Sequence, residues 1–159
     1  MNNRIRRHAF VSATVILSAL LTFSFPTAAD AKTISRSAAS AHYLAAAKKV
    51  NAAFGKFATE VGKWKEKTTD AQAAAEAKPA ILALKIFDTS MIDENWPKNT
   101  VTDIHTLVSD DAAVIGDLES LATLNFLNLS NWESTFNRDS SLLSSAVTFV
   151  RHDLGLPPA

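Results

Sequence analysis

The stretch TVTDIHTLVSDDAAVIGDLESLATLN, residues Thr100–Asn125, decides how this chain folds. Its apolar residues recur at spacings of three, four or seven positions, which places them on one face of an α-helix. This apolar stripe consists of Val101, Ile104, Val108, Ile115, Leu118 and Ala122. A helix with one apolar face must bury that face, so the stretch predicts that other helices pack against it. Asn99 or Thr100 is the expected cap.

The strongest periodic signal lies earlier, in a predicted helix over about 37–67. Its apolar positions form an unbroken seven-residue repeat, namely Tyr43, Ala47, Val50, Phe54, Phe57, Val61 and Trp64. A second predicted helix, about 70–92, follows a capping box made by Thr69 and Gln72. It contains Pro79, which predicts a kink or a division into two shorter helices.

The last predicted helix covers about 131–154, with Ser130 or Asn131 as its cap. Gly155 and the two prolines after it are typical of a helix end. Together the four segments predict an all-α domain over residues 32–159, arranged as an antiparallel up-and-down four-helix bundle. No segment alternates apolar and polar residues at period two, so a sheet is not expected.

The first thirty-one residues have the layout of a secretory signal peptide. Three arginines precede the uncharged apolar stretch Ala9–Phe25, and Ala29–Ala31 offers small residues for cleavage after Ala31. A retained membrane anchor is the alternative, and the pair Arg6-Arg7 leaves the twin-arginine route open beside the general one. We therefore expect a secreted or cell-envelope protein. Removing residues 1–31 leaves 13 basic and 15 acidic residues, a net charge near −2.

Metal and cofactor sites are not expected. The chain has no cysteine, which excludes thiolate ligands and thiol catalysis. His42, His105 and His152 fall near one end of the predicted bundle, but the heptad register places them at its surface. No Glu-x-x-His pair exists, so the di-iron pattern of ferritin-like bundles is missing.

Two acids fall on the strict seven-residue repeat, Asp111 in the third predicted helix and Asp139 in the fourth. Buried carboxyl groups there would have raised pKa values. A straight helix has 3.6 residues per turn, however, so its apolar face drifts away from a strict repeat. With that drift Ala112 turns inward and Asp111 moves to the rim, which we expect because burying an unpaired charge is costly.

The charged residues predict a candidate interaction surface. A row on the first helix, recurring every seventh residue, consists of His42, Lys49, Lys56 and Lys63. The third helix carries acids and no base; its outward acids are Asp103, Asp110 and Asp117. The row is either an ordinary solvated face or a contact with an anionic envelope polymer or lipid headgroups. Nucleic acid fits poorly, because the charges of the chain balance.

Catalytic signatures are missing from the sequence. There is no phosphate-binding glycine loop, no Gly-x-Ser-x-Gly elbow and no His-Glu-x-x-His pair, and none of the many serines has a base at helical spacing. We therefore expect a non-enzymatic cell-envelope or protein interaction module. The alternative is a carrier of an apolar small molecule or haem, with Tyr43, Phe54, Phe57 and the kink at Pro79 shaping a cavity.

The order of motifs resembles uncharacterised exported helical proteins of mycobacteria and related actinobacteria. The residues that carry the resemblance are Trp96-Pro97, Asp103-Ile104-His105, Ile115-Gly116-Asp117-Leu118 and the ending 150–157, VRHDLGLP. The resemblance implies secretion and an all-helical fold. It implies no activity, because such proteins carry none that can be transferred.

Overall fold

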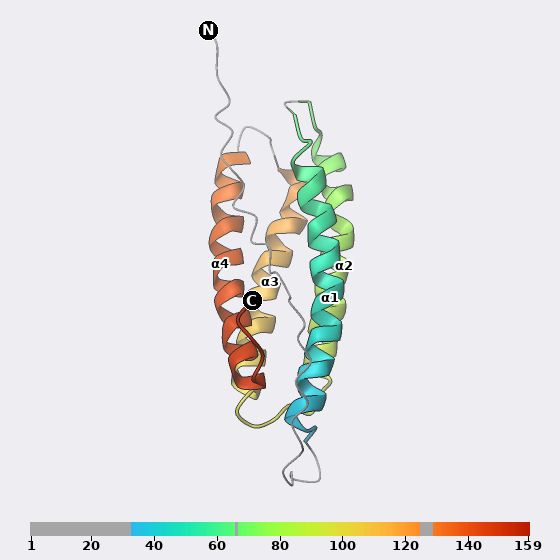
Figure 1. Ribbon diagram of the computed structural model, residues 1–159. Helices are drawn as coiled ribbons and strands as arrows, with labels where there is room; N and C mark the ends of the chain where they lie inside the picture. The colour runs from blue at the N-terminus through green and yellow to red at the C-terminus, as the bar shows by residue number, and fades with distance from the viewer. Residues whose placement is uncertain (1–32, 66, 125–128) are drawn as a thin grey trace.

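The computed structural model describes residues 33–65, 67–124 and 129–159, and these ranges contain helices but no strand. The elements are α1 (Arg36–Val61), α2 (Asp70–Ile92), α3 (Val101–Ser120), the short 3₁₀ turn η1 (Leu121–Thr123) and α4 (Leu129–Leu154). Figure 1 shows the four α-helices side by side with their long axes roughly aligned. The predicted signal peptide lies outside the described residues. None of the described helices is both long enough and apolar enough to cross a membrane.

Most helix boundaries follow the sequence, with three corrections. α3 ends at Ser120 rather than near residue 125, and the 3₁₀ turn η1 follows it. The capping box before α2 is confirmed, since Thr69 Oγ1 accepts from the Gln72 amide and Gln72 Oε1 accepts from the Thr69 amide. α1 ends at Val61 rather than near Lys67, with Gly62 as its C-cap. α4 already begins at Leu129, so Ser130 and Asn131 lie inside the helix and do not cap it.

α2 runs unbroken through Pro79, so the division into two helices does not occur. A proline inside a helix removes one amide donor and leaves the carbonyl four residues earlier without its partner. That carbonyl belongs to Ala75, and both Ala75 and Pro79 are exposed. Water can therefore bond to the free carbonyl, which explains why the helix tolerates the proline.

The end of α4 is a Schellman motif. The Gly155 amide donates to the His152 carbonyl, and the Leu156 amide donates to the Arg151 carbonyl. Gly155 has φ +69°, a backbone conformation that favours glycine. Together with the prolines that follow, this motif ends α4 as the sequence predicts.

Replacing Gly155 by alanine should destabilise the protein by about 1–2 kcal/mol. Alanine at this position would have to keep an unfavourable positive φ, and its Cβ would lie 3.0 Å from the guanidinium carbon of Arg36. Urea unfolding followed by circular dichroism measures the change. Alanine at Gly116, where the added Cβ meets nothing within 4 Å, is the matched control and should be neutral or slightly stabilising. Equal effects at both positions would contradict the expectation.

The buried residues of α2 and α3 keep a strict seven-residue repeat. The buried positions of α2 are Ala73, Ala77, Ala80, Leu84, Phe87 and Met91, and those of α3 are Ile104, Leu107, Asp111, Val114, Ile115 and Leu118, continued by Leu121 of η1. Leu107 and Val114 were missing from the predicted stripe. Val101 and Ala122, which were in it, are exposed.

The expected drift of α3 is therefore wrong. Asp111 is 1% exposed and Asp139 is 7% exposed, whereas Ala112 is exposed. A seven-residue repeat stays on one face when neighbouring helices wind around each other with 3.5 residues per turn. The helices follow that repeat and carry both acids inward. Asp111 divides the core into two apolar clusters, one around Phe87 and Leu107 and one around Leu84 and Val114.

Candidate interaction surface

An apolar groove of about 250 Å³ lies between α1 and α2. Its walls are formed on α1 by Ala46 and Lys49 and on α2 by Pro79, Leu82, Ala83, Ile86, Phe87 and Ser90. Most of these side chains are apolar, and Lys49 is the one lysine among them. The groove thus offers an apolar floor with a positive charge on its wall.

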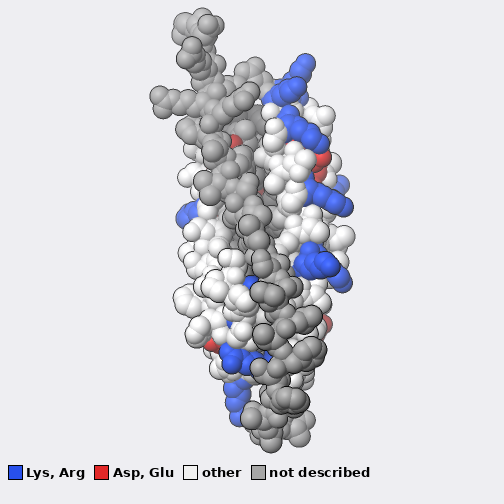
Figure 2. Space-filling model, viewed as in Figure 1, with Lys and Arg blue, Asp and Glu red and all other residues white. Residues whose placement is uncertain are grey.

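The lysine row borders this groove. Lys49 lines it directly, and His42, one heptad earlier, contacts Ser90 on the opposite wall. Lys49, Lys56 and Lys63 are all exposed, and Figure 2 shows Lys and Arg side chains following one another along the side where α1 and α2 lie. Lys63 lies just beyond the end of α1, where its ammonium is 2.7 Å from Glu60 Oε1. The row therefore belongs to the α1–α2 face of the molecule.

Two large apolar side chains stand exposed beside the row. Leu82 is 60% exposed and Ile86 is 52% exposed, and both line the groove. Leu142 and Phe149 of α4 are exposed in the same way, at 54% and 59%. On the α1–α2 face, however, the exposed apolar residues sit next to lysines.

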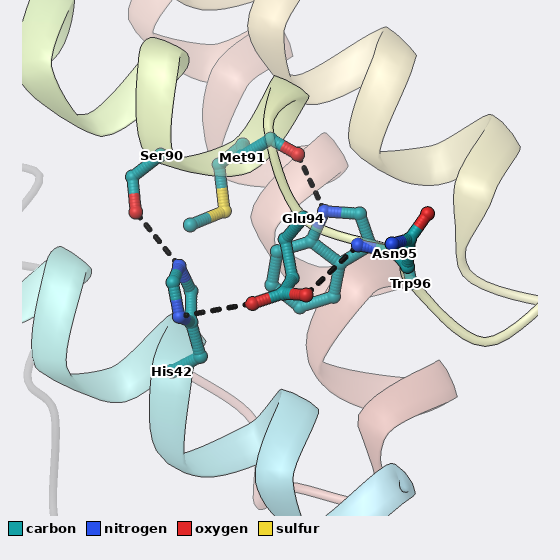
Figure 3. A network of polar contacts seen from close by, with 6 residues as sticks. All are labelled: His42, Ser90, Met91, Glu94, Asn95 and Trp96. Carbon is teal, nitrogen blue, oxygen red and sulfur yellow. Dashed lines mark hydrogen bonds and ion pairs between the residues drawn. The ribbon is translucent and has the colours of Figure 1, made fainter. Parts of the chain in front are cut away.

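His42 is the centre of a polar network at one end of the groove (Figure 3). Its Nε2 lies 2.7 Å from Ser90 Oγ, and its Nδ1 lies 3.5 Å from Glu94 Oε2. Glu94 Oε1 in turn accepts a hydrogen bond of 2.9 Å from the Asn95 amide. His42 therefore lies at the surface as predicted, but it is half-buried, with a hydrogen bond at one ring nitrogen and a carboxylate facing the other.

Trp96 holds the histidine ring from the side. Its ring packs edge-on against that of His42, with 5.6 Å between the centroids. The Trp96 indole N–H donates to the Met91 carbonyl at the end of α2, as Figure 3 also shows. Trp96 is buried, so the loop after α2 is anchored in the core and fixes Glu94 beside the histidine.

The other two histidines are exposed, as the register predicted. His105 lies on the outer face of α3, and the His152 side chain is 86% exposed. Within the ranges 33–65, 67–124 and 129–159, no group of three or more His, Asp or Glu side chains is arranged to hold a metal ion.

The acidic face of α3 is less open than expected. Asp103, Asp110 and Asp117 are each half-buried rather than exposed. Asp117 lies near the Asp139 carboxylate of α4, and Arg138 donates two hydrogen bonds to Asp139, at 2.7 and 3.1 Å. The three acids therefore do not form one exposed surface opposite the lysine row.

The pKa values of Asp117 and Asp139 are shifted in opposite directions. Burial, together with the nearby Asp139 carboxylate, raises the pKa of Asp117 to about 6. The hydrogen bonds from Arg138 lower the pKa of Asp139. The pair therefore has one acid that stays ionised and one that titrates near neutral pH.

A second carboxyl pair joins α2 and α3, where the side chains of Asp88 and Asp111 lie close enough to shift each other's pKa. Burial raises the pKa of Asp111 to about 9, and the negative charge of Asp88 adds to the effect. Burial also raises the pKa of Asp88. Asp88 Oδ1 and Asp111 Oδ2 are buried and find no hydrogen-bond partner in the described part of the chain. With its pKa raised to about 9, Asp111 holds a proton at neutral pH and can donate it to the neighbouring Asp88 carboxylate.

A buried arginine completes the polar core. Arg151 is 1% exposed, and it donates from Nε to the Pro157 carbonyl at 2.7 Å and from one terminal nitrogen to the Pro158 carbonyl at 3.3 Å. Burial raises the pKa of Tyr43 to about 12, while the positive charge of Arg151 lowers it and the charge of Asp111 raises it. Tyr43 of α1 thus lies within electrostatic reach of both Asp111 and Arg151.

The aromatic residues suggested for an internal ligand cavity pack into the core. Tyr43 and Phe57 are buried, and Phe54 packs against the cluster that contains Phe57. Pro79, the fourth residue of that prediction, lines the groove between α1 and α2 instead. The open space that Pro79 borders is therefore on the outer face of the helix pair α1–α2.

Comparisons with known proteins add no family to this description. No family model, curated protein or solved structure matches the chain. The resemblance to exported actinobacterial proteins stays a prediction from the sequence. The geometry of the described residues is therefore the basis for inferring a function.

Proposed function

We propose that this protein is an exported helical bundle whose α1–α2 face binds an anionic lipid surface of the cell envelope. One observation carries the proposal: Lys49 lines the same groove as Leu82 and Ile86, whose side chains are more than half exposed. Lysines alone would suit any polyanion. Exposed leucine and isoleucine beside them favour a surface that has an apolar layer below its charges.

The energetics agree with this occupant. A lysine near an anionic leaflet contributes about 1 kcal/mol, and this contribution is lost as salt screens the charges. Burying the exposed parts of Leu82 and Ile86 adds an apolar contribution of about 25 cal/mol per Å² that salt does not screen. Lys49 and Lys56 supply the first contribution, and the groove supplies the second. A charged polysaccharide would use the lysines only.

The proposed architecture is the up-and-down bundle with a preceding signal peptide. Contacts between helix ends support alternating directions: Ser40 near the start of α1 donates to the carbonyl of Leu154 at the end of α4. Trp132 near the start of α4 donates to the carbonyl of Asp117 near the end of α3. The arginines and apolar stretch before residue 31 support export.

Vesicle flotation with the exported form tests the proposal. We expect binding to phosphatidylglycerol vesicles, weaker binding in high salt, and no binding to phosphatidylcholine vesicles. Reversing the charges at Lys49, Lys56 and Lys63 to glutamate should abolish binding, because attraction becomes repulsion along the whole row. Absence of binding to phosphatidylglycerol vesicles, or unchanged binding by the triple variant, would overturn the proposal.

Two matched controls separate this face from general properties of the protein. Lys85→Glu changes the net charge as much as Lys49→Glu does, but Lys85 lies against Glu119 of α3 and should have the smaller effect. Leu82→Ser should weaken the binding that remains in high salt. Leu142→Ser, which changes an equally exposed leucine on α4, should not. Mass spectrometry of the exported form defines its N-terminus.

A further inference from the structure

We propose that Ser90, His42 and Glu94 form a nucleophile, a base and a positioning acid that together hydrolyse esters of short acyl chains, with the acyl group in the α1–α2 groove. The sequence predicts no catalysis because these residues are far apart along the chain: 48 positions separate His42 from Ser90. Folding brings them into contact at the end of the groove.

The order of atoms is the one that nucleophilic catalysis by serine requires. Ser90 Oγ lies 2.7 Å from His42 Nε2, and the other ring nitrogen, Nδ1, faces Glu94 Oε2 at 3.5 Å. A carboxylate beside Nδ1 favours the tautomer that carries its proton there, which leaves Nε2 free to accept the serine proton. The edge contact with Trp96 keeps the ring in this orientation.

The Ser90 hydroxyl differs from other hydroxyls on these helices. Five of them donate to the carbonyl four residues earlier, which is the ordinary choice in a helix: Thr59, Thr89, Thr106, Ser145 and Thr148. Ser90 instead bonds to a histidine on a neighbouring helix. A hydroxyl committed to a base in this way is poised to lose its proton.

The groove supplies the remaining requirements. Ser90 is one of its lining residues, so an acyl group in the groove has its carbonyl carbon within reach of the hydroxyl. The apolar walls suit a hydrocarbon chain, and the volume of about 250 Å³ lies below that of drug-sized pockets, which favours short chains. Lys49 also lines the groove and adds a positive charge to its walls.

The reaction proceeds in two balanced steps. Ser90 Oγ attacks the ester carbonyl carbon while its proton passes to His42 Nε2; the bond to the alcohol oxygen then breaks, and the alcohol leaves with that proton. Water attacks the acylated serine, gives its proton to His42, and the carboxylic acid leaves as the serine regains a proton. The sum is ester plus water giving acid plus alcohol, with no oxidation or reduction.

Hydrolysis of p-nitrophenyl butyrate by the full chain tests this proposal, together with labelling by a fluorophosphonate probe and peptide mapping of the labelled site. We expect hydrolysis above that of buffer and labelling at Ser90. Ser90→Ala and His42→Gln should each reduce the rate on the order of 100-fold or more. Ser141→Ala, at an exposed serine of α4, is the matched control and should keep the rate.

Glu94→Gln should lower kcat with little change in KM, because a positioning residue orients the base and does not touch the substrate. Circular dichroism shows whether each variant is folded, and labelling of the unaltered protein is independent of any variant. Absence of label at Ser90, or equal hydrolysis by the parent and Ser90→Ala, overturns the proposal. The substrate is soluble, so this outcome leaves the proposed binding to vesicles unaffected, and failure of that binding leaves this proposal unaffected.

Discussion

Replacing Asp111 by asparagine should make the protein more stable at alkaline pH while changing little near pH 4. The wild-type carboxyl group is buried in the core beside Asp88, and burial raises its pKa to about 9. Asparagine has the same shape, can still donate a hydrogen bond to Asp88, and cannot ionise. It therefore retains the contact of the protonated acid and removes the charge that appears when the proton is lost.

The direction of the pH dependence follows from proton binding. The folded protein holds a proton on Asp111 up to about pH 9, whereas the unfolded chain releases it near the ordinary value of 3.8. Across this range the folded state binds more protons, so the free energy of unfolding falls as the pH rises. This stabilisation is complete below about pH 4 and is lost by the time the pH has risen through the folded pKa.

Urea unfolding between pH 5 and pH 9, followed by tryptophan fluorescence, measures the effect. The gap between Asp111→Asn and the parent should widen by up to about 1.4 kcal/mol per pH unit. Titratable or charged groups of all four helices act at or near this site: Asp88 of α2, Asp110 of α3, Tyr43 of α1 and, next to Tyr43, Arg151 of α4. Asp103→Asn, on the same helix, should keep the shape of the wild-type curve. Parallel curves for Asp111→Asn and the parent would contradict the raised pKa of Asp111.

Asp111 also shows where sequence reasoning about the fold succeeds and fails. Periodicity predicts all four helices because a repeat of apolar residues is a local property of the chain. Whether a helix keeps a strict repeat depends on how its neighbours wind around it, which is not local. The cost of burying a charge argued for drift, but a second acid, Asp88, lies opposite and can accept the proton that Asp111 holds. That compensation appears only once α2 and α3 are packed.

The candidate sites were only partly predictable for the same reason. The row containing Lys49 and Lys56 is visible in the sequence because it repeats along one helix. The sequence alone does not show that Leu82 and Ile86 are exposed, because periodicity cannot tell where the buried part of a wide apolar stripe ends. The contact of His42 with Ser90 joins two helices, and no spacing within either helix signals it. Such a contact can be predicted only when the register between the two helices is known.

Arg151 is a further residue that the sequence did not single out, although it is the largest of the fully buried side chains among the described residues. An arginine near a helix end usually extends along the surface toward water. Here its stem is covered by the core, and its Nε and one terminal nitrogen bond to the carbonyls of Pro157 and Pro158. The chain after Gly155 therefore folds back over α4, and the arginine ties it down.

Truncating Arg151 to alanine should lower the free energy of unfolding by about 2–5 kcal/mol. The change opens a cavity in the core and removes two hydrogen bonds from a charged donor. Part of this loss is offset, because NH1 of Arg151 is buried with no hydrogen-bond partner among the described residues and its desolvation cost disappears. Urea unfolding measures the total effect. Release of the C-terminal tail is measured separately, as faster removal of Ala159 and Pro158 by a carboxypeptidase that cleaves after proline.

Arg151→Met separates the two causes. Methionine keeps an unbranched apolar stem and fills most of the cavity, so this variant should recover much of the stability that alanine loses. It cannot donate to the proline carbonyls, so its tail should be trimmed as fast as that of Arg151→Ala. If methionine instead protects the tail as well as arginine does, packing rather than hydrogen bonding holds the C-terminus. If alanine leaves the unfolding free energy unchanged, the buried arginine contributes no net stability, because its unpartnered nitrogen cancels what its two bonds and its packing supply.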